Sequence, residues 1–259
     1  MKELTSEEYK KLLLDILINV ASFCENHQIK YSVAYGTLIG AIRHKGFIPW
    51  DDDIDIIMMR DDYERFRSLY KDTRYVIVNG ENQPNHLHIR VSDSATMIKH
   101  SKKSIANKFY KDGLWIDVFP IDKVPDSVRG YRFHKRIIKT FAGLRQTGEI
   151  GGKNLLKKMA RLPLKPFTKV FGRLAEKRMV RYNKENKQTA ANLGVYYLNF
   201  PTFPLSYMKD YIDVEFEGHT FKAIKEYDAF LRGVYGDYMQ FPPENKRVAH
   251  HHYKAYLKE

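Results

Sequence analysis

The sequence has 259 residues, of which 43% are hydrophobic and 14% aromatic; this suits a globular domain and excludes an intrinsically disordered chain. A single cysteine, Cys24, excludes an intramolecular disulfide and a cysteine-based zinc site. The net charge of +13 points to an anionic partner.

The N-terminal part of the chain predicts an amphipathic helix over residues 5–27. Apolar residues recur there at the spacing of one helix face, and Thr5 or Ser6 is available as the N-cap. Residues 1–11 are polar and lack the apolar core of a secretory signal. Asp15 and Asn19 interrupt the next apolar stretch well short of the roughly 20 residues that span a bilayer. We therefore expect a cytoplasmic protein without a membrane-spanning segment.

A strand, a helix and a second strand are predicted next. Residues 31–35 are typical of a short strand, and residues 36–44 of a helix that opens on Gly-Thr and ends at Gly46 as its C-cap. Residues 54–59 are predicted as the second strand. Asp61 and the glutamate three residues later have the spacing of a capping box, which indicates a helix through residue 69.

The remaining elements are predicted from shorter patterns: strands over 75–79, 86–92 and 115–119, and a helix over 221–235 that ends at Gly236. Residues 129–187 carry 18 Lys or Arg and three acids. This segment is expected to be mostly helical but broken at Pro163 and Pro166. We expect a single α+β domain over residues 1–259, with 129–187 as a basic helical insertion and 221–259 as a C-terminal helical segment.

Four acids occupy five positions at the second strand: Asp51, Asp52, Asp53 and Asp55. Strand side chains alternate between faces, so Asp53 and Asp55 are expected to point the same way with Asp51 near them. Like charges this close raise each other's pKa and destabilise the fold unless a cation neutralises them. Mg²⁺ prefers carboxylate oxygens and substrate phosphate. The run is a candidate metal site, and a calcium-binding or merely solvated acidic loop is the alternative.

A lone acid in a later apolar strand, Asp117, is the third candidate ligand. A buried carboxylate without a partner is costly, so Asp117 either hydrogen-bonds locally or joins a cation. Asp122 is expected to be a loop or cap residue. Ahead of the acids, Gly36 permits close backbone approach, Thr37 adds a hydroxyl donor, and a helix start offers free amides to a phosphate. By itself, Gly-Thr at a helix start is more often an ordinary N-cap. When a strand with an Asp-x-Asp pattern follows it, a phosphate-binding site is the better interpretation.

This ordered set resembles the nucleotidyltransferase superfold. The segment GTLIGAIRHKGFIPWDDDIDIIMMRDDYERF (residues 36–66) resembles, more specifically, the signature of the LicD family of lipopolysaccharide cholinephosphotransferases, distantly similar to fukutin-related ribitol-phosphate transferases. The resemblance continues in LWIDVFPID (residues 114–122) and YGDYMQFPPENKRVAHH (residues 235–251). It implies a nucleotidyltransferase-like mixed β-sheet flanked by helices.

The resemblance also implies a reaction. Phosphocholine, or another alcohol phosphate, would pass from a CDP-activated donor such as CDP-choline to a hydroxyl of a cell-surface glycan (lipopolysaccharide or teichoic acid) or its lipid-linked precursor, with release of CMP. The matching catalytic positions are Asp53, Asp55 and Asp117. With Asp51 they are the expected ligands of two Mg²⁺ or Mn²⁺ ions, which can bridge the donor diphosphate. Asp52 lies in the same motif and is a candidate substrate contact.

Other positions are candidates for binding the donor. Those for phosphate and nucleotide are Gly36, Thr37, Arg43 and Lys45, although Lys45 is equally explained as a solvated cation. A choline ammonium needs aromatic faces, for which Tyr35 and Trp50 are candidates, with core packing as the alternative. In the tail, Arg247, His250 and His251 are candidates for phosphate contact or proton relay; the competing interpretation is a surface helix rich in histidine.

The basic segment, residues 129–187, interleaves cationic and apolar positions. This pattern suits a helix that lies peripherally on the anionic inner face of the cell membrane. It also suits a helix that packs on the catalytic body with its charges in water. A nucleic-acid surface is possible on charge alone, but no recognised motif accompanies it, and no nucleic-acid partner is expected.

Three other functions stay open at this stage. A true nucleotidyltransferase would use a nucleoside triphosphate and release pyrophosphate. A nucleic-acid-binding module would depend on the basic segment and not on the acids. The intact set of acids argues against the third, an inactive scaffold.

Overall fold

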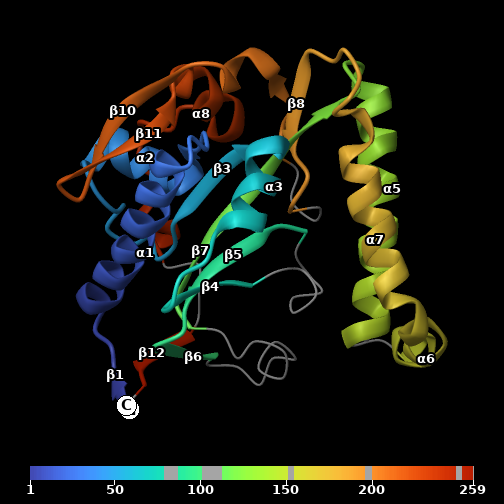
Figure 1. Ribbon diagram of the computed structural model, residues 1–259, viewed down its shortest axis with the longest axis horizontal. Coiled ribbons are helices and arrows are strands. Elements are labelled where there is room, and N and C mark those ends of the chain that lie inside the picture. The colour runs from blue at the N-terminus through green and yellow to red at the C-terminus, as the bar shows by residue number, and fades with distance from the viewer. Residues whose placement is uncertain (79–86, 101–112, 151–154, 196–199, 249–252, 259) are drawn as a thin grey trace. The chain divides into compact units, whose positions relative to one another are not determined.

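The structure is a computed structural model, and it describes residues 1–78, 87–100, 113–150, 155–195, 200–248 and 253–258 (Figure 1). It is a mixed α and β fold, as expected from the sequence. The chain divides into two compact units, which are described separately here. The first unit comprises Met1–Val78, Arg90–Phe119 and Ser206–Glu259, and the second Asn79–Ile89 and Pro120–Leu205. The predicted basic segment falls within the second unit, and the expectation of a single domain stays a prediction.

Helix α1 (Ser6–Asn26) opens the first unit and confirms the predicted N-terminal helix. Thr5 is its N-cap: the Glu8 amide donates to the Thr5 hydroxyl at 3.2 Å, and the Glu8 carboxylate accepts from the Thr5 amide at 3.0 Å. This reciprocal capping box satisfies two amides that a helix start leaves unpaired. The apolar face is buried through Leu13, Ile16, Leu17, Val20 and Cys24.

One sheet carries most of the strands, in the order β2-β3-β7-β5-β4. Its members are β2 (Ser32–Val33), β3 (Asp55–Met59), β7 (Trp115–Val124), β5 (Ile89–Asp93) and β4 (Tyr75–Val78). Pairing of β2 with β3 is antiparallel, with Val33 opposite Ile56, and so is pairing of β4 with β5. The strand predicted over 115–119 is confirmed, but β7 continues five residues further, to Val124. Asp122, expected in a loop, lies buried on β7 and accepts a hydrogen bond from Asn183 at 2.6 Å.

Two helices flank strand β3 in the chain: α2 (Tyr35–His44) before it and α3 (Arg60–Leu69) after it. The C-cap of α2 is Lys45 in the left-handed conformation (φ 58°), and not Gly46 as predicted. Gly46 instead permits close packing, because a Cβ there would lie 2.2 Å from the Glu217 carboxylate. The expected capping box of α3 is also absent: the helix starts at Arg60, so Asp61 lies inside its first turn and makes no side-chain cap.

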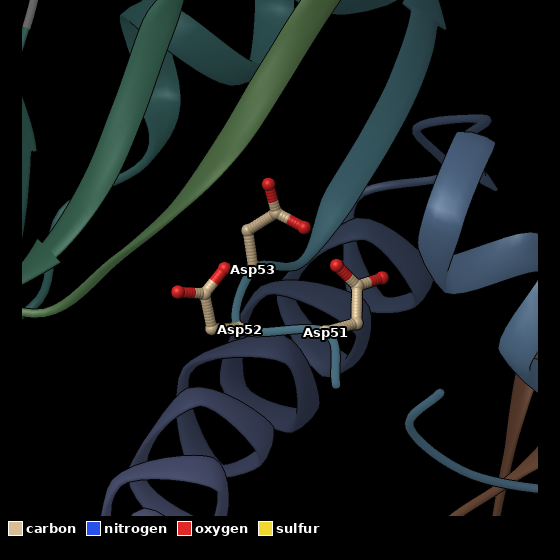
Figure 2. A group of neighbouring side chains, drawn as sticks. All are labelled: Asp51, Asp52 and Asp53. Atoms are coloured by element: carbon tan, nitrogen blue, oxygen red, sulfur yellow. The ribbon is translucent and has the colours of Figure 1, made fainter. Parts of the chain in front are cut away.

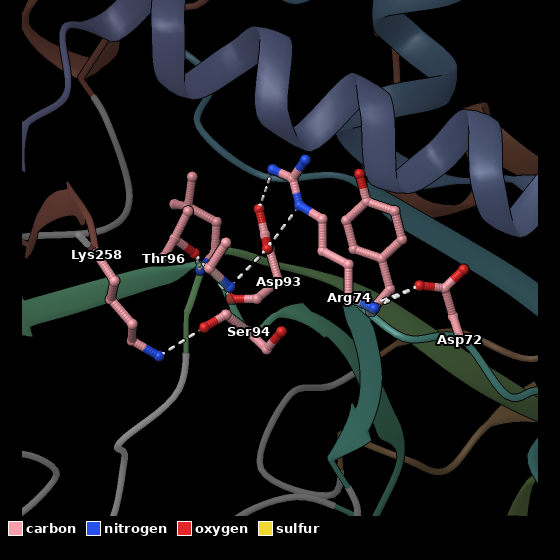
Figure 3. Close-up of polar contacts among 9 residues, drawn as sticks. Asp72, Arg74, Asp93, Ser94, Thr96 and Lys258 are labelled. Atoms are coloured by element: carbon pink, nitrogen blue, oxygen red, sulfur yellow. Dashed lines mark hydrogen bonds and ion pairs between the residues drawn. The ribbon is translucent and has the colours of Figure 1, made fainter.

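A buried aspartate organises the end of the β4–β5 pair. Asp93 is fully buried, and its two carboxylate oxygens accept from Arg74 Nε at 3.0 Å and Nη2 at 2.7 Å (Figure 3). The same carboxylate accepts the Ala95 amide at 2.9 Å. Such a two-pronged pair satisfies a buried charge, which would otherwise be expensive. Asp93 therefore has a structural role in this turn.

The C-terminal part of the first unit was predicted as helical, and the structure corrects this. Strands β10 (Tyr211–Phe216) and β11 (His219–Ile224) form a hairpin across Glu217 and Gly218, both with positive φ. Among the described residues of 221–259, α8 (Tyr227–Tyr235) is the α-helix, and its C-cap is Gly236 as predicted. Strand β12 (Tyr253–Leu257) pairs with β6 (Thr96–His100) and with β1 (Lys2–Glu3). Partners distant in the chain decided β12, which local periodicity does not reveal.

The second unit is built on three helices: α5 (Val128–Ile150), α6 (Leu155–Leu164) and α7 (Thr168–Met179). Helices α5 and α7 lie side by side (Figure 1). The C-terminal half of β7 pairs with β8 (Thr189–Asn192), which pairs with β9 (Phe203–Pro204). Pro163 lies inside α6 and not at a break, while Pro166 lies in a 3-10 turn, Lys165–Phe167. Other 3-10 turns are Val180–Tyr182, Leu205–Met208 and, in the first unit, Glu244–Lys246.

The core of the second unit is small and apolar; its buried members are Leu87, Val124, Ile138, Ala142, Ala175, Met179, Ala191 and Leu193. The apolar side of the basic segment therefore packs in part within its own unit, and the expectation that it packs on the catalytic body stays a prediction. Among the described residues, no helix is both long and apolar enough to cross a membrane.

Candidate functional site

Three successive carboxylates form the centre of the candidate site. Asp51, Asp52 and Asp53 lie in the segment before β3, and each offers an oxygen within 4.8 Å of those of the other two (Figure 2). Asp51 is buried, whereas Asp52 and Asp53 are half-buried. The Asp51 amide donates to the Ile48 carbonyl at 2.9 Å, which holds the segment in a turn. The alternation predicted for a strand therefore begins only at Asp55; it is the turn that gathers the first three acids.

Asp55 belongs to the same electrostatic group. Burial raises the pKa of Asp55 well above its usual value, and the neighbouring charges of Asp53, Asp117 and Asp51 raise it further, against an opposing effect of Arg90. A divalent cation beside these carboxylates would favour their ionised forms. Oxygen-only ligands that crowd negative charge in this way fit a hard cation such as Mg²⁺ or Mn²⁺.

Asp117 is held on strand β7 by two donors. Its Oδ1 accepts from Arg90 Nε at 2.8 Å and its Oδ2 from Trp115 Nε1 at 3.0 Å. The Arg90 guanidinium also lies 4.2 Å from the centre of the Trp115 ring. These two bonds orient the Asp117 carboxylate. The role of Asp117 as a ligand stays a prediction.

The start of α2 faces the acids. A Cβ on Gly36 would lie 2.5 Å from Asp51 Oδ2, so only glycine leaves room for that carboxylate. No side chain caps this helix start, and its positive end therefore stabilises the charge of Asp51. The Thr37 hydroxyl accepts the Asp55 amide at 2.9 Å, which ties α2 to β3. The structure thus brings Gly36 and Thr37 to the acids, and their contact with phosphate stays a prediction.

Tyr35 has an unusual backbone beside this group. Its φ of 49° is left-handed, a conformation that a bulky residue adopts at a cost and that is concentrated at functional sites. The side chain is buried, with its ring centre 5.8 Å from those of Phe119 and Phe230. These contacts explain Tyr35 as packing, which was the alternative to a substrate contact.

Arg43 and Lys45 lie at the other end of α2 from Gly36 and Thr37, about 9 to 13 Å along the axis at helical rise. Arg43 Nη1 donates to the carbonyls of Tyr238 at 2.6 Å and Gln240 at 3.4 Å. Lys45 is an exposed C-cap residue. Arg43 therefore anchors the C-terminal segment on α2, and the structure does not group either cation with the helix start.

An aromatic cluster contains Trp50, the residue immediately before Asp51, and Phe241 from the C-terminal segment. The ring centres of Trp50 and Phe241 lie 6.1 Å apart, edge to face. Arg247 lies over both rings, 5.6 Å from Trp50 and 5.5 Å from Phe241, and Arg43 lies 4.6 Å from Phe241. The cluster joins two predicted residues, Trp50 and Arg247, to one that sequence reasoning missed, Phe241. The predicted residues His250 and His251 lie outside the described part of the chain.

Tyr235 is a second residue that sequence reasoning missed. It is the last residue of α8. Although Tyr235 is 47% exposed, partial desolvation and the charges of Asp55 and other nearby acids raise its pKa above the usual value. Sequence signals for Tyr235 and Phe241 were limited to their position in the C-terminal motif. No local pattern pairs that motif with residues almost 200 positions earlier.

Comparison with known proteins agrees with this arrangement. Residues 28–142 match the family described as LicD/FKTN/FKRP, nucleotidyltransferase domain. The chain is 32% identical over 267 aligned positions to the lipopolysaccharide cholinephosphotransferase LicD of Haemophilus influenzae, a match that covers 99% of this chain and 100% of that protein. Shorter matches reach uncharacterized proteins of Rickettsia typhi (38% over 64 residues, 25% of this chain and 21% of that protein) and Rickettsia prowazekii (42% over 50 residues, 19% of each). The chain belongs to the LicD family.

Proposed function

We propose that this protein transfers phosphocholine, or a related alcohol phosphate, from a CDP-activated donor to a hydroxyl of a cell-surface glycan or its lipid-linked precursor. The observation that carries the proposal is the carboxylate group of Asp51, Asp52, Asp53 and Asp55 in a chain similar over its whole length to a cholinephosphotransferase. As part of it we assign the nucleotidyltransferase superfold, because α2, the acids at β3 and Asp117 on β7 follow one another in that order.

The proposed reaction is a displacement at phosphorus. The acceptor oxygen forms a bond to the phosphorus of phosphocholine while the bond from that phosphorus to the bridging oxygen breaks, and CMP leaves with the electron pair. A carboxylate of the cluster accepts the hydroxyl proton. Asp51, Asp53, Asp55 and Asp117 would hold divalent cations, which neutralise charge on the diphosphate. Arg90 and Trp115 keep Asp117 oriented.

Within this proposal, the aromatic cluster favours the nucleotide over the choline. Arg247 already places a cation over Trp50 and Phe241, and Arg43 places another over Phe241. A choline ammonium would meet like charge there, whereas a CMP group offers a flat base and an anionic phosphate. We therefore assign Trp50, Phe241 and Arg247 to the CMP half of the donor.

We also propose that the second unit lies peripherally on an anionic membrane surface. Large apolar side chains are exposed among its cations: Phe133, Met159, Leu162 and Phe167 are 62%, 65%, 78% and 55% exposed. Apolar area and positive charge on the same helices are the features of interfacial binding.

The deciding experiment offers the purified protein CDP-choline, CDP-ribitol or CDP-glycerol with Mg²⁺ and choline-free lipopolysaccharide, and measures CMP. Release of CMP from one donor, lost on chelation and in Asp53→Asn, is the expected result. The alternative, a nucleotidyltransferase, would release pyrophosphate from CTP and no CMP from any of the three donors. That outcome would overturn the proposal.

A further inference from the structure

The second unit contains a cavity of about 570 Å³ that the proposed reaction does not use. Its walls come from the first three turns of α5, from residues 125–127 just before that helix, and from residues 200–202. All these residues belong to the second unit, so the cavity is complete within it. It lies apart from the carboxylate cluster in the chain and shares none of its residues.

One face of α5 supplies the charge. Arg132, Lys135, Arg136 and Lys139 recur at spacings of three and four residues and all line the cavity. Like charges one helical turn apart destabilise a helix. Burial and the charge of Lys139 lower the pKa of Lys135. In the part of the chain that the structure describes, no ion pair engages Arg132, Arg136 or Lys139, so their charge is available to a ligand.

The cavity also includes the start of α5. The Ser127 hydroxyl accepts the Gly130 amide at 3.1 Å, and the positive end of the 23-residue helix adds to the field of the four cations. One carboxylate, Asp126, also lines the cavity. It accepts the Gln188 amide at 3.0 Å, and hydrogen bonds from Thr189 and Gln188 lower its pKa. Its single negative charge leaves the cavity strongly positive.

The remaining wall is apolar. Tyr131 closes it by donating its hydroxyl to the Phe200 carbonyl at 3.2 Å, and burial raises the pKa of Tyr131 to about 12. Pro125, Val128 and Pro201 complete this wall, and Val128 is 66% exposed. A merely solvated cationic face would need neither a concave shape nor aromatic walls. Cations on one side and apolar side chains on the other fit a ligand that has both characters.

We propose that this cavity binds a phosphate group that carries an apolar substituent. The phosphate lies against Arg132, Arg136 and Lys139, and the apolar part against Tyr131 and Val128. Either a membrane lipid or a soluble phosphate compound presents this chemistry. The inference is independent of the proposed reaction, because binding is measured without turnover and without a donor.

The test uses inorganic pyrophosphate and vesicles as probes, in the presence of EDTA so that the carboxylate cluster holds no cation. Titration calorimetry measures pyrophosphate, and co-sedimentation compares phosphatidylcholine vesicles with and without phosphatidic acid. The pocket variant is Arg132→Gln/Arg136→Gln/Lys139→Gln. The matched control is Lys11→Gln/Arg67→Gln/Lys209→Gln, which removes the same number of positive charges from exposed positions of the first unit. Circular dichroism checks that both variants fold.

We expect at least one probe to bind, and the pocket variant to bind it at least about tenfold more weakly, with less than about a twofold change in the control. If binding needs phosphatidic acid vesicles, the ligand is a lipid head group. If pyrophosphate binds and the vesicles do not, it is a soluble phosphate. Equal losses in the two variants would mean that general charge is responsible and would overturn the proposal, as would the failure of both probes to bind the unmodified protein.

Discussion

The two units use charge in opposite ways. In the first, four carboxylates lie close together in and beside one short turn, where they raise the pKa of Asp55. In the second, most of the described cations lie on exposed helix faces, where water screens them and each costs little, although Arg145 is buried. Crowded and partly buried charge needs a strong counter-charge, whereas spaced and exposed charge does not. This contrast underlies the two proposals: a bound cation at the carboxylates of the first unit, and reversible binding of an anion in the second.

The largest expected effect is a loss of activity, without a loss of stability, when an aspartate of the first unit is replaced. Asp53→Asn or Asp55→Asn should lower the rate of CMP release by about a thousandfold or more, because a ligand to the catalytic cation is lost. Without metal, the unfolding temperature should stay the same or rise, since one repelling charge has been removed. Unchanged turnover in both variants would remove the metal assignment.

The same variants test metal binding without turnover. Mg²⁺ or Mn²⁺ should raise the unfolding temperature of the unmodified protein, since a ligand that binds only the folded state stabilises it. The increase should be absent in Asp53→Asn. Asn186→Asp adds an exposed acid in the second unit and is the control that should keep the full increase.

A buried ion pair in the first unit should dominate its stability. Arg90→Met leaves Asp117 with an uncompensated buried charge and should lower the free energy of unfolding by about 3 kcal/mol. Asp117→Asn in the same chain should restore part of this loss, because the amide carries no charge. Urea unfolding of the two single variants and the double variant measures the coupling; additive losses would contradict it.

In the second unit, a buried histidine should make the free energy of unfolding depend on pH. His134 is fully buried beside Tyr182, with ring centres 4.9 Å apart, and neither ring nitrogen has a hydrogen-bond partner among the described residues. Burial and the charge of Arg178 lower the pKa of His134 to about 4. A depressed histidine pKa means that the unfolded chain takes up the proton first. Stability is complete above about pH 6.5 and falls as the pH approaches about 4.

The loss from this histidine should reach roughly 3 kcal/mol. His134→Phe should flatten that pH dependence, and urea unfolding at pH 7 and pH 4.5 measures it. His219→Phe, at an exposed position in the first unit, is the control that should keep the dependence. An identical pH profile in His134→Phe and the unmodified protein would contradict the assignment.

The smallest expected effect is on donor affinity. Phe241→Leu or Trp50→Leu should raise the KM for the CDP donor about tenfold, with little change in kcat, because stacking on the base is lost. Phe167→Leu removes an exposed aromatic ring of the second unit and should leave KM unchanged. If the choline half binds these rings instead, the increase would depend on which alcohol the donor carries.

Local sequence was sufficient for some elements and misleading for others. The start of α1 at its N-cap and the hydrophobic strand β3 were readable because both depend on neighbours in the chain. Strand β12 was not, since its partners β1 and β6 lie far away in sequence. At the site, the acids were found from their density. Phe241 was missed because its position beside Trp50 depends on a segment that Arg43 anchors on α2.

The sequence by itself determined the kinds of residue at the site: a dense run of aspartates, a preceding Gly-Thr, and a basic segment with interleaved apolar residues. Only the tertiary structure decided how they are combined. It placed Asp51 against Gly36, held Asp117 between Arg90 and Trp115, and collected four cations of α5 around a cavity. The physical reason is that charge and hydrogen bonding act over a few ångströms in space, whatever the separation along the chain.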